Sequence, residues 1–247
     1  MGFLPVAFFL KRTIINLMRI KGIQKLSLVD FPSKMSSILF TGGCNFRCPF
    51  CHNSRLVLHP EVQEDLDIDE IFSFLEKRKN MLDGVVVTGG EATLQYDLVE
   101  FLEKIKNLGY LVKLDTNGYK PDVLESVISQ KCADYIAMDI KNSLDSYAMT
   151  SGIEDFDKEK IIQSASLLMS SGIDYEFRTT VVAELHGKEN FEKIGLWLKG
   201  ARIYFLQSFV PSENTIEKNF SKPSADALKN YAEILRNYID NVQIRNS

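Results

Sequence analysis

The chain has 247 residues, which allows one or two domains of ordinary size, or a single α/β barrel of about 250 residues. Hydrophobic residues make up 45% and charged residues 25%, a globular composition that excludes a disordered chain. The formal net charge of −4 argues against a nucleic-acid-binding protein that relies on broad neutralisation of phosphates.

The chain begins with an apolar segment, followed by the entry into a strand. Residues 2–10 are apolar, but this stretch is far shorter than the ~20 residues that a membrane-spanning helix requires. Positive charges follow the apolar run and no small-residue cleavage site comes next, so a secretory signal fits poorly. We interpret residues 1–17 as an N-terminal extension, either a start-site artefact or a short amphipathic helix, and residues 18–247 as one domain. Residues 19–23 lead into the first strand, and we expect a cytoplasmic protein without a membrane partner.

The rest of the chain alternates short apolar or β-branched runs with apolar residues at helical spacing. The predicted strands are residues 37–40, 85–87, 111–114, 135–138, 175–182 and 203–206. The helices that follow them are predicted around residues 68–75 and 98–105, from Pro121 onward, and around residues 161–168, 189–199 and 228–239. Strands that alternate with amphipathic helices predict a parallel sheet with right-handed crossovers. Six such units are too few for a closed eight-stranded barrel, so we expect an open, partial (β/α)6 TIM-like barrel, with a doubly wound sheet as the alternative.

Polar residues and glycines collect where the predicted strands end. In parallel α/β sheets, ligands bind at the carboxyl ends of the strands, so these residues predict one site built from several loops. For any one of them alone, the simpler interpretation is that it merely ends its strand. In strand order they are Cys44 to Cys51, Gly89 to Glu91, Asp115 to Asn117, Asp139 and Lys141, Arg178 and Gln207.

Three of the four cysteines, Cys44, Cys48 and Cys51, lie close together and indicate a metal centre instead of a disulfide framework. Thiolates at this spacing on one loop can hold one face of a cubic iron–sulfur cluster, which normally takes four cysteines. The fourth, Cys132, precedes an apolar strand and is predicted to be a core residue. Three ligands would leave one iron open for a substrate or cofactor.

Two other metal centres compete with a cluster. Cys48 to His52 also fits the haem-attachment pattern C-x-x-C-H, which requires an exported chain and leaves Cys44 unexplained. A structural zinc ion needs a fourth ligand, and His52 adjoins Cys51 too closely for an easy tetrahedron. His59 and His186 have no supporting pattern. The iron–sulfur interpretation is therefore favoured.

The cysteine loop and the residues Thr88 to Glu91 resemble the radical S-adenosylmethionine (SAM) superfamily. Residues 51–53, 114–118 and 139–141 narrow this resemblance to the glycyl-radical enzyme activating proteins, including pyruvate formate-lyase activating enzyme. Two further stretches, residues 28–32 and 177–180, are most similar to the branch that activates anaerobic ribonucleoside-triphosphate reductase. The resemblance covers nearly the whole predicted domain.

This resemblance implies a [4Fe–4S] cluster held by Cys44, Cys48 and Cys51, with SAM chelating the open iron. Reductive cleavage of SAM would give a 5′-deoxyadenosyl radical, which removes a hydrogen atom from a glycine Cα of a partner enzyme. No catalytic residues beyond the cluster and cofactor are expected. The implied partners are a glycyl-radical enzyme, most specifically anaerobic ribonucleotide reductase, and a low-potential electron donor such as flavodoxin or ferredoxin.

The resemblance also implies which residues bind SAM. Phe50 would pack near the adenine, with the backbone around His52 at its edge. The Gly89 and Gly90 carbonyls would reach the methionyl ammonium, with Glu91 as a countercharge or simply a loop carboxylate. The remaining implied contacts are Lys141 to the methionyl carboxylate, Asp139 beside the cofactor, and Arg178 near the methionine or ribose, or in an internal ion pair.

Two further roles are implied, and one family residue is missing. Asp115, Thr116 and Asp139 match positions that can hold a monovalent cation, or they form a hydrogen-bond network. Asp30 matches a position that faces the partner's loop. The family's histidine near the ribose is not evident, because Gln207 or Phe209 occupies that stretch.

Two other functions remain open. One is a small-molecule radical SAM enzyme similar to the deazaguanine-forming synthases. The residues His52 and Asn53 after Cys51 favour an activating enzyme over this alternative. The other is a non-enzymatic metal or electron-transfer protein.

Overall fold

The computed structural model describes residues 18–245, which form one eight-stranded sheet whose strands follow each other in sequence order. The interpretation of residues 1–17 as an extension lies outside the described residues. The strands are β1 (Ile20–Ser27), β2 (Ser36–Thr41), β3 (Gly84–Gly89), β4 (Leu111–Thr116), β5 (Tyr135–Asp139), β6 (Asp174–Val181), β7 (Ile203–Ser208) and β8 (Asn241–Arg245). The helices are α1 (Ser54–Leu58), α2 (Ile68–Lys77), the 3₁₀ helix η1 (Ala92–Leu94), α3 (Leu98–Asn107), α4 (Pro121–Ser129), α5 (Tyr147–Ser151), α6 (Lys158–Ser170), α7 (Lys188–Trp197) and α8 (Ala225–Arg236).

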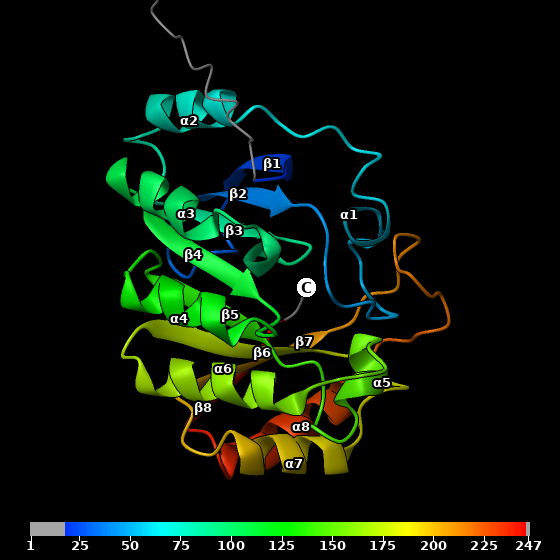
Figure 1. Cartoon of the computed structure of the whole chain (residues 1–247). Coiled ribbons are helices and arrows are strands. Elements are labelled where there is room, and N and C mark those ends of the chain that lie inside the picture. The colour runs from blue at the N-terminus through cyan, green and yellow to red at the C-terminus, as the bar shows by residue number, and fades with distance from the viewer. Residues whose placement is uncertain (1–17, 246–247) are drawn as a thin grey trace, which may run out of the picture.

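The six predicted strands are β2 to β7, which pair in parallel, and a helix follows each of them. Because β1 and β8 do not pair with each other, the sheet stays open, and the predicted partial barrel is confirmed. Figure 1 shows α3, α4 and α6 along one side of the sheet, while α1 and α5 lie beyond the carboxyl ends of the strands. Within residues 18–245, no helix is both long and apolar enough to cross a membrane.

The structure has two edge strands, β1 and β8, in addition to the six that were predicted. The stretch expected to lead into the first strand is itself β1, which pairs antiparallel with β2. At the other edge, β8 pairs in parallel with β7. Its five residues alternate polar Asn241, Gln243 and Arg245 with apolar Val242 and Ile244, a short strand pattern at the end of the chain that the six predicted units did not include.

The two faces of the sheet differ in chemistry because side chains alternate along each strand. The outward face carries Val87, Leu114, Ile136, Phe177 and Leu206, all fully buried beneath the helices. Strand register places the alternate residues together on the inner face. That face is largely polar and carries Lys113, Asp115, Asp139, Glu176, Arg178 and Arg245.

A glycine fixes α5 against the cysteine loop. Gly152 ends α5 in the left-handed region, at φ 69°, where a side chain is disfavoured. A Cβ atom there would lie 2.4 Å from the carbonyl oxygen of Arg47. Arg47 N in turn donates to the Ser151 carbonyl at 2.8 Å, so the helix end and the loop are in direct contact.

The last strand is held to the inner face by an ion pair between the partly exposed Arg245 and the buried Glu176. Both guanidinium Nη atoms of Arg245 donate to the carboxylate of Glu176, each at 2.7 Å. Glu176 is fully buried and also accepts from the Tyr135 hydroxyl at 2.9 Å. The Arg245 guanidinium lies 3.5 Å from the centre of the Phe205 ring. Charge pairing thus replaces apolar packing at this end of the inner face.

We expect Arg245→Met to destabilise the protein by about 3 kcal/mol, because it leaves the Glu176 carboxylate buried without its cation. The double variant Arg245→Met/Glu176→Gln should recover part of that loss, since no buried charge remains. Urea unfolding followed by circular dichroism measures both effects. As a control, Lys193→Met removes an exposed ion pair with Asp145 and should change the unfolding free energy little. Equal losses in the single and double variants would contradict a role for the charge.

Candidate active site

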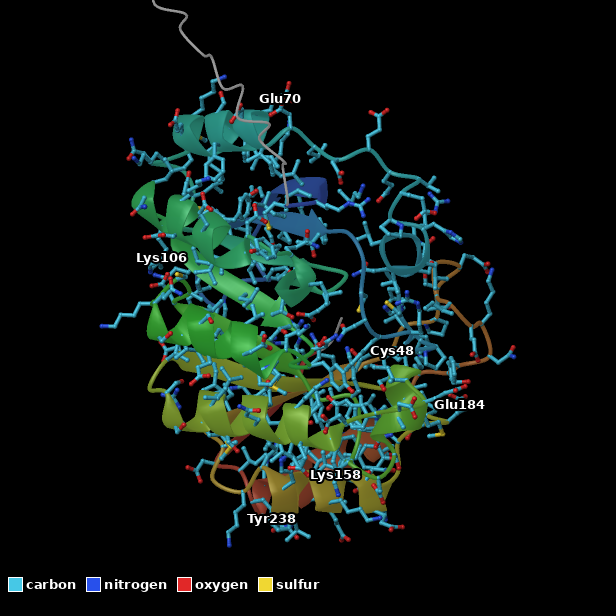
Figure 2. The ribbon with its side chains drawn as sticks, viewed as in Figure 1. Cys48, Glu70, Lys106, Lys158, Glu184 and Tyr238 are labelled. Carbon is cyan, nitrogen blue, oxygen red and sulfur yellow. The ribbon has the colours of Figure 1, made fainter. Side chains whose placement is uncertain are left out.

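One pocket lies at the carboxyl ends of β2 to β6, and every predicted site residue except Asp30 and Gln207, which is on β7, lines it. Figure 2 shows Cys48 at this edge, beside α5, and Lys106 at the far end of the sheet. The pocket residues come from the β2–α1 loop, the β3–η1 loop, the ends of β4 and β5, and the middle of β6. They are Cys44, Cys48, Phe50, Cys51, His52, Gly89, Gly90, Glu91, Asp115, Thr116, Asp139, Lys141 and Arg178, together with Phe46, Asn53, Val57, Thr88, Asn117 and Thr180.

The three clustered thiols share a poorly solvated environment. Burial raises the pKa of the Cys44 thiol to about 12 and that of Cys48 to about 11, and it also raises the pKa of Cys51. The thiolate form therefore needs a nearby positive charge, which iron ions would supply. Cys132 is buried but does not line this pocket, and its Sγ donates to the Gln130 carbonyl.

The donor set fits an iron–sulfur cluster with an open iron. Three soft sulfur ligands from one loop line the same pocket. The side-chain nitrogen of Asn45, in the same loop, is buried without a hydrogen-bond partner. A buried donor beside thiolate sulfurs is suited to an acceptor on a bound group.

Contacts from four other segments position the cysteine loop. The Asn117 side chain donates to the Asn45 side-chain oxygen at 2.8 Å, and α5 contacts the loop as described above. The segment after β7 contacts it too, because Glu217 N donates to the Pro49 carbonyl at 2.7 Å. A Cβ atom on Gly90 would lie 1.9 Å from the Gly43 carbonyl oxygen, so only glycine allows the β3 loop to cross there.

Glu91 is a buried loop carboxylate. It accepts from Thr93 N at 3.0 Å, from the Thr93 and Thr116 hydroxyls at 2.5 and 2.7 Å, and from Asn117 N at 2.7 Å. Burial raises its pKa, and these hydrogen bonds offset only part of that effect. In this geometry Glu91 joins η1 to the end of β4, and its role as a countercharge to the cofactor stays a prediction.

Arg178 forms the internal ion pairs that were its alternative role. Its Nη2 lies 3.1 Å from Asp115 Oδ2, and its Nε lies 2.5 Å from Asp139 Oδ1. Lys113 pairs with Asp115, and Lys141 Nζ donates to Asp139 at 2.9 Å. Burial alone would raise the pKa values of both carboxyls, but Arg178 and the lysines more than offset it and lower them.

These ion pairs bear on the predicted monovalent cation. The Asp115 and Asp139 carboxylates already have cationic partners, and the Thr116 hydroxyl donates to Glu91. Among the residues that the structure describes, no group of three or more His, Cys, Asp or Glu side chains surrounds a place for a single metal ion. The cation site stays a prediction.

Aromatic rings form one side of the pocket. The His52 ring stacks on Phe209 with the ring centres 5.2 Å apart, and Phe50 meets Phe209 edge-on at 6.4 Å. His52 Nε2 is 2.7 Å from the Val210 carbonyl oxygen, to which it donates. Phe209 thus lies where the family's ribose histidine was sought, and it contacts the cysteine loop.

Sequence reasoning gave Asn53 and Asn117 no role, although both belong to the motifs already described. Asn53 Nδ2 donates to the Gly89 carbonyl at 2.9 Å and so joins the cysteine loop to β3. The signal available in the sequence was that each asparagine directly follows predicted site residues, Asn53 after His52 and Asn117 after Thr116.

Asp30 lies away from the pocket. Because β1 is antiparallel to β2, the turn between them meets the amino ends of the parallel strands, opposite the cysteine loop. The Asp30 carboxylate accepts from the Ser27 hydroxyl within that turn. Its predicted contact with a partner's loop is therefore separate from the pocket and stays a prediction.

Comparison with known proteins adds three findings. Residues 38–197 match the family model of the Radical SAM superfamily. A Methanocaldococcus jannaschii protein named "Putative glycyl-radical enzyme activating enzyme" is 36% identical over 92% of this chain and 95% of its own. The pyruvate formate-lyase-activating enzyme of Clostridium pasteurianum is 28% identical over 74% of this chain and 77% of its own.

The fold also resembles a solved structure. The crystal structure of Streptococcus suis SuiB bound to S-adenosylmethionine superposes with a TM-score of 0.63 at 16% identity. It covers 85% of this chain, which spans about half (51%) of that longer protein. At this level of identity the likeness concerns the fold.

We expect Cys44→Ala, Cys48→Ala and Cys51→Ala each to abolish the broad iron–sulfur absorbance after anaerobic reconstitution, because each removes one of three ligands. Cys132→Ala is the matched control and should retain both absorbance and iron content. Loss of the cluster in Cys132→Ala would contradict the three-ligand, open-iron arrangement.

Proposed function

Because this chain belongs to the radical SAM superfamily, we propose that it is a glycyl-radical enzyme activating enzyme and that its partner is an anaerobic ribonucleotide reductase. The observation that carries the proposal is the pocket itself, in which three thiols of one loop face Lys141 and Arg178. The relative from M. jannaschii, similar over nearly the whole chain, supports the activating class. The reductase as partner rests on the residues 28–32 and 177–180.

The family implies a [4Fe–4S] cluster and SAM. Once bound, they supply the reductive cleavage of SAM and the 5′-deoxyadenosyl radical that takes a hydrogen atom from the partner's glycine. In our proposal Cys44, Cys48 and Cys51 hold three irons, and the chain offers no ligand to the fourth. A low-potential donor such as flavodoxin or ferredoxin would deliver the electron.

We assign SAM to the opposite side of the same pocket. Lys141 would pair with the methionyl carboxylate, because it lines the pocket and its ammonium charge is only partly neutralised by Asp139, which also pairs with Arg178. The backbone carbonyls of Gly89 and Gly90 would accept from the methionyl ammonium. Phe50 and the His52–Phe209 stack offer a flat apolar surface for the adenine.

Arg178 would act mainly by organising charge. Its guanidinium keeps both carboxylates, Asp115 and Asp139, in their ionised form and fixes where they point. Asp139 then orients the Lys141 ammonium at 2.9 Å. We therefore place Arg178 beside the cofactor as a support for Asp139, with any monovalent cation taking oxygen atoms of Asp115, Thr116 and Asp139.

The partner test incubates the reduced, reconstituted protein and SAM with candidate glycyl-radical enzymes under anaerobic conditions. We expect a glycyl-radical EPR signal from anaerobic ribonucleotide reductase and none from pyruvate formate-lyase. A signal from pyruvate formate-lyase alone would refute the partner and retain the class. No signal from either, with steady 5′-deoxyadenosine formation on a small molecule, would favour a small-molecule radical SAM enzyme. Absence of both SAM cleavage and radical formation would favour an electron-transfer protein.

Asp30 supplies a separate test of partner recognition. We expect Asp30→Ala to reduce radical formation on the partner more than uncoupled SAM cleavage, because Asp30 is remote from the pocket. Asp30→Asn is the matched variant that can still accept from Ser27 and so preserves the turn. Equal losses in both reactions would assign Asp30 to the fold instead.

A further inference from the structure

His186 is a buried histidine whose two ring nitrogens are both engaged by backbone groups. It lies between β6 and α7 and is 4% exposed. Val182 N donates to His186 Nδ1 at 3.0 Å, and His186 Nε2 lies 2.9 Å from the carbonyl oxygen of Lys141. Nδ1 also lies 3.2 Å from the Val182 carbonyl oxygen. Because Nδ1 accepts from Val182 N, the neutral ring carries its proton on Nε2, toward the Lys141 carbonyl. This neutral tautomer satisfies both backbone groups at once.

The surroundings keep the ring neutral. Burial lowers the pKa of His186, and its bonds to backbone carbonyls offset only part of that effect. The Phe191 ring stacks against it at 5.9 Å. On the other side, the Tyr231 hydroxyl of α8 donates to the His186 carbonyl at 3.1 Å. Figure 2 places the neighbouring residue Glu184 on the same side of the molecule as Cys48.

The contact between His186 and Lys141 lies in the segment 140–142, in which each residue is held by a hydrogen bond to β6 or to the loop that follows it. The Ile140 carbonyl accepts from the Thr179 hydroxyl at 2.6 Å, and the Asn142 side chain donates to the Leu185 carbonyl at 2.9 Å. Between them, the Lys141 carbonyl accepts from His186, and the backbone amide of Lys141 bonds to the Tyr147 hydroxyl. A lysine side chain is flexible, so the position of its backbone decides where Nζ can reach.

We propose that His186 is a positioning residue for SAM: through the Lys141 carbonyl, it holds the Lys141 ammonium at the methionyl carboxylate. This inference rests on the proposed function, which assigns that carboxylate to Lys141. Among the residues that the structure describes, no hydrogen bond or ring contact joins His186 to the cysteine loop, so cluster assembly should be independent of it. We therefore expect loss of His186 to lower the affinity for SAM and not the iron content.

The test measures SAM dissociation constants of the reconstituted holoenzyme by equilibrium dialysis, with iron content and melting temperature determined in parallel. His186→Leu removes both ring nitrogens and should weaken SAM binding about tenfold, the equivalent of one lost hydrogen bond, at unchanged iron content. His186→Gln offers one acceptor and one donor and should restore most of the affinity. Tyr231→Phe is the matched control: it loosens the same helix packing, lowers the melting temperature and leaves SAM affinity unchanged.

Two outcomes separate this inference from the proposed function. If His186→Leu lowers the melting temperature but binds SAM as the unmodified chain does, the histidine is purely structural and the inference is refuted. If Lys141→Met binds SAM normally, the assignment of Lys141 itself fails. Should His186→Leu not fold, His186→Asn, which is too short to join both backbone groups, takes its place with the same expected loss.

Discussion

The inner face of this sheet carries charged side chains in a poorly solvated place, and the fold must neutralise them internally. Arg178 lies between Asp115 and Asp139, and Lys113 and Lys141 complete the pairing. Removing one member of such a buried set would cost about 3 to 5 kcal/mol, because the remaining charges would stay buried. The network joins the ends of β4 and β5 to the middle of β6. The ion pairs that neutralise the buried charges of the inner face therefore also fix the strand segments that line the pocket.

The outward face explains why most of the fold could be predicted. In the runs Val85 to Val87 and Tyr135 to Met138, the outward residues are buried beneath helices and the inward Val86 and Ala137 are apolar as well, so both runs give a strong strand signal. The edge strands carry less of it, because β8 alternates Asn241, Gln243 and Arg245 with only Val242 and Ile244. Pairing with β7 and the Glu176 ion pair, both remote in sequence, hold that segment in the sheet.

The site was predictable as far as topology alone places residues. A residue that follows a parallel strand must lie at the carboxyl edge, which is why Cys44, Gly89 and Asp139 line one pocket. The same reasoning does not bring Asp30 to the pocket, because a residue that precedes the parallel strand β2 lies at the amino edge. Nor does it reach His186, whose functional contact is a backbone carbonyl 45 residues away, and a backbone acceptor leaves no mark on the sequence.

The positions of Asp30 and the pocket constrain how one partner could use both. A partner that contacts Asp30 and delivers a glycine to the pocket must extend along the inner face, from the amino to the carboxyl ends of the strands. The unpaired edges of β1 and β8 leave the barrel open for this. However, Phe31 already occupies the inner face, buried against Tyr135 with the ring centres 6.1 Å apart. The adjacent Leu28 and Val29 are 67% and 83% exposed, so the turn offers an apolar contact surface next to its buried anchor. Binding at this turn would therefore be coupled to the inner face through Phe31, and an effect of Asp30 on radical transfer would follow without any contact between Asp30 and SAM.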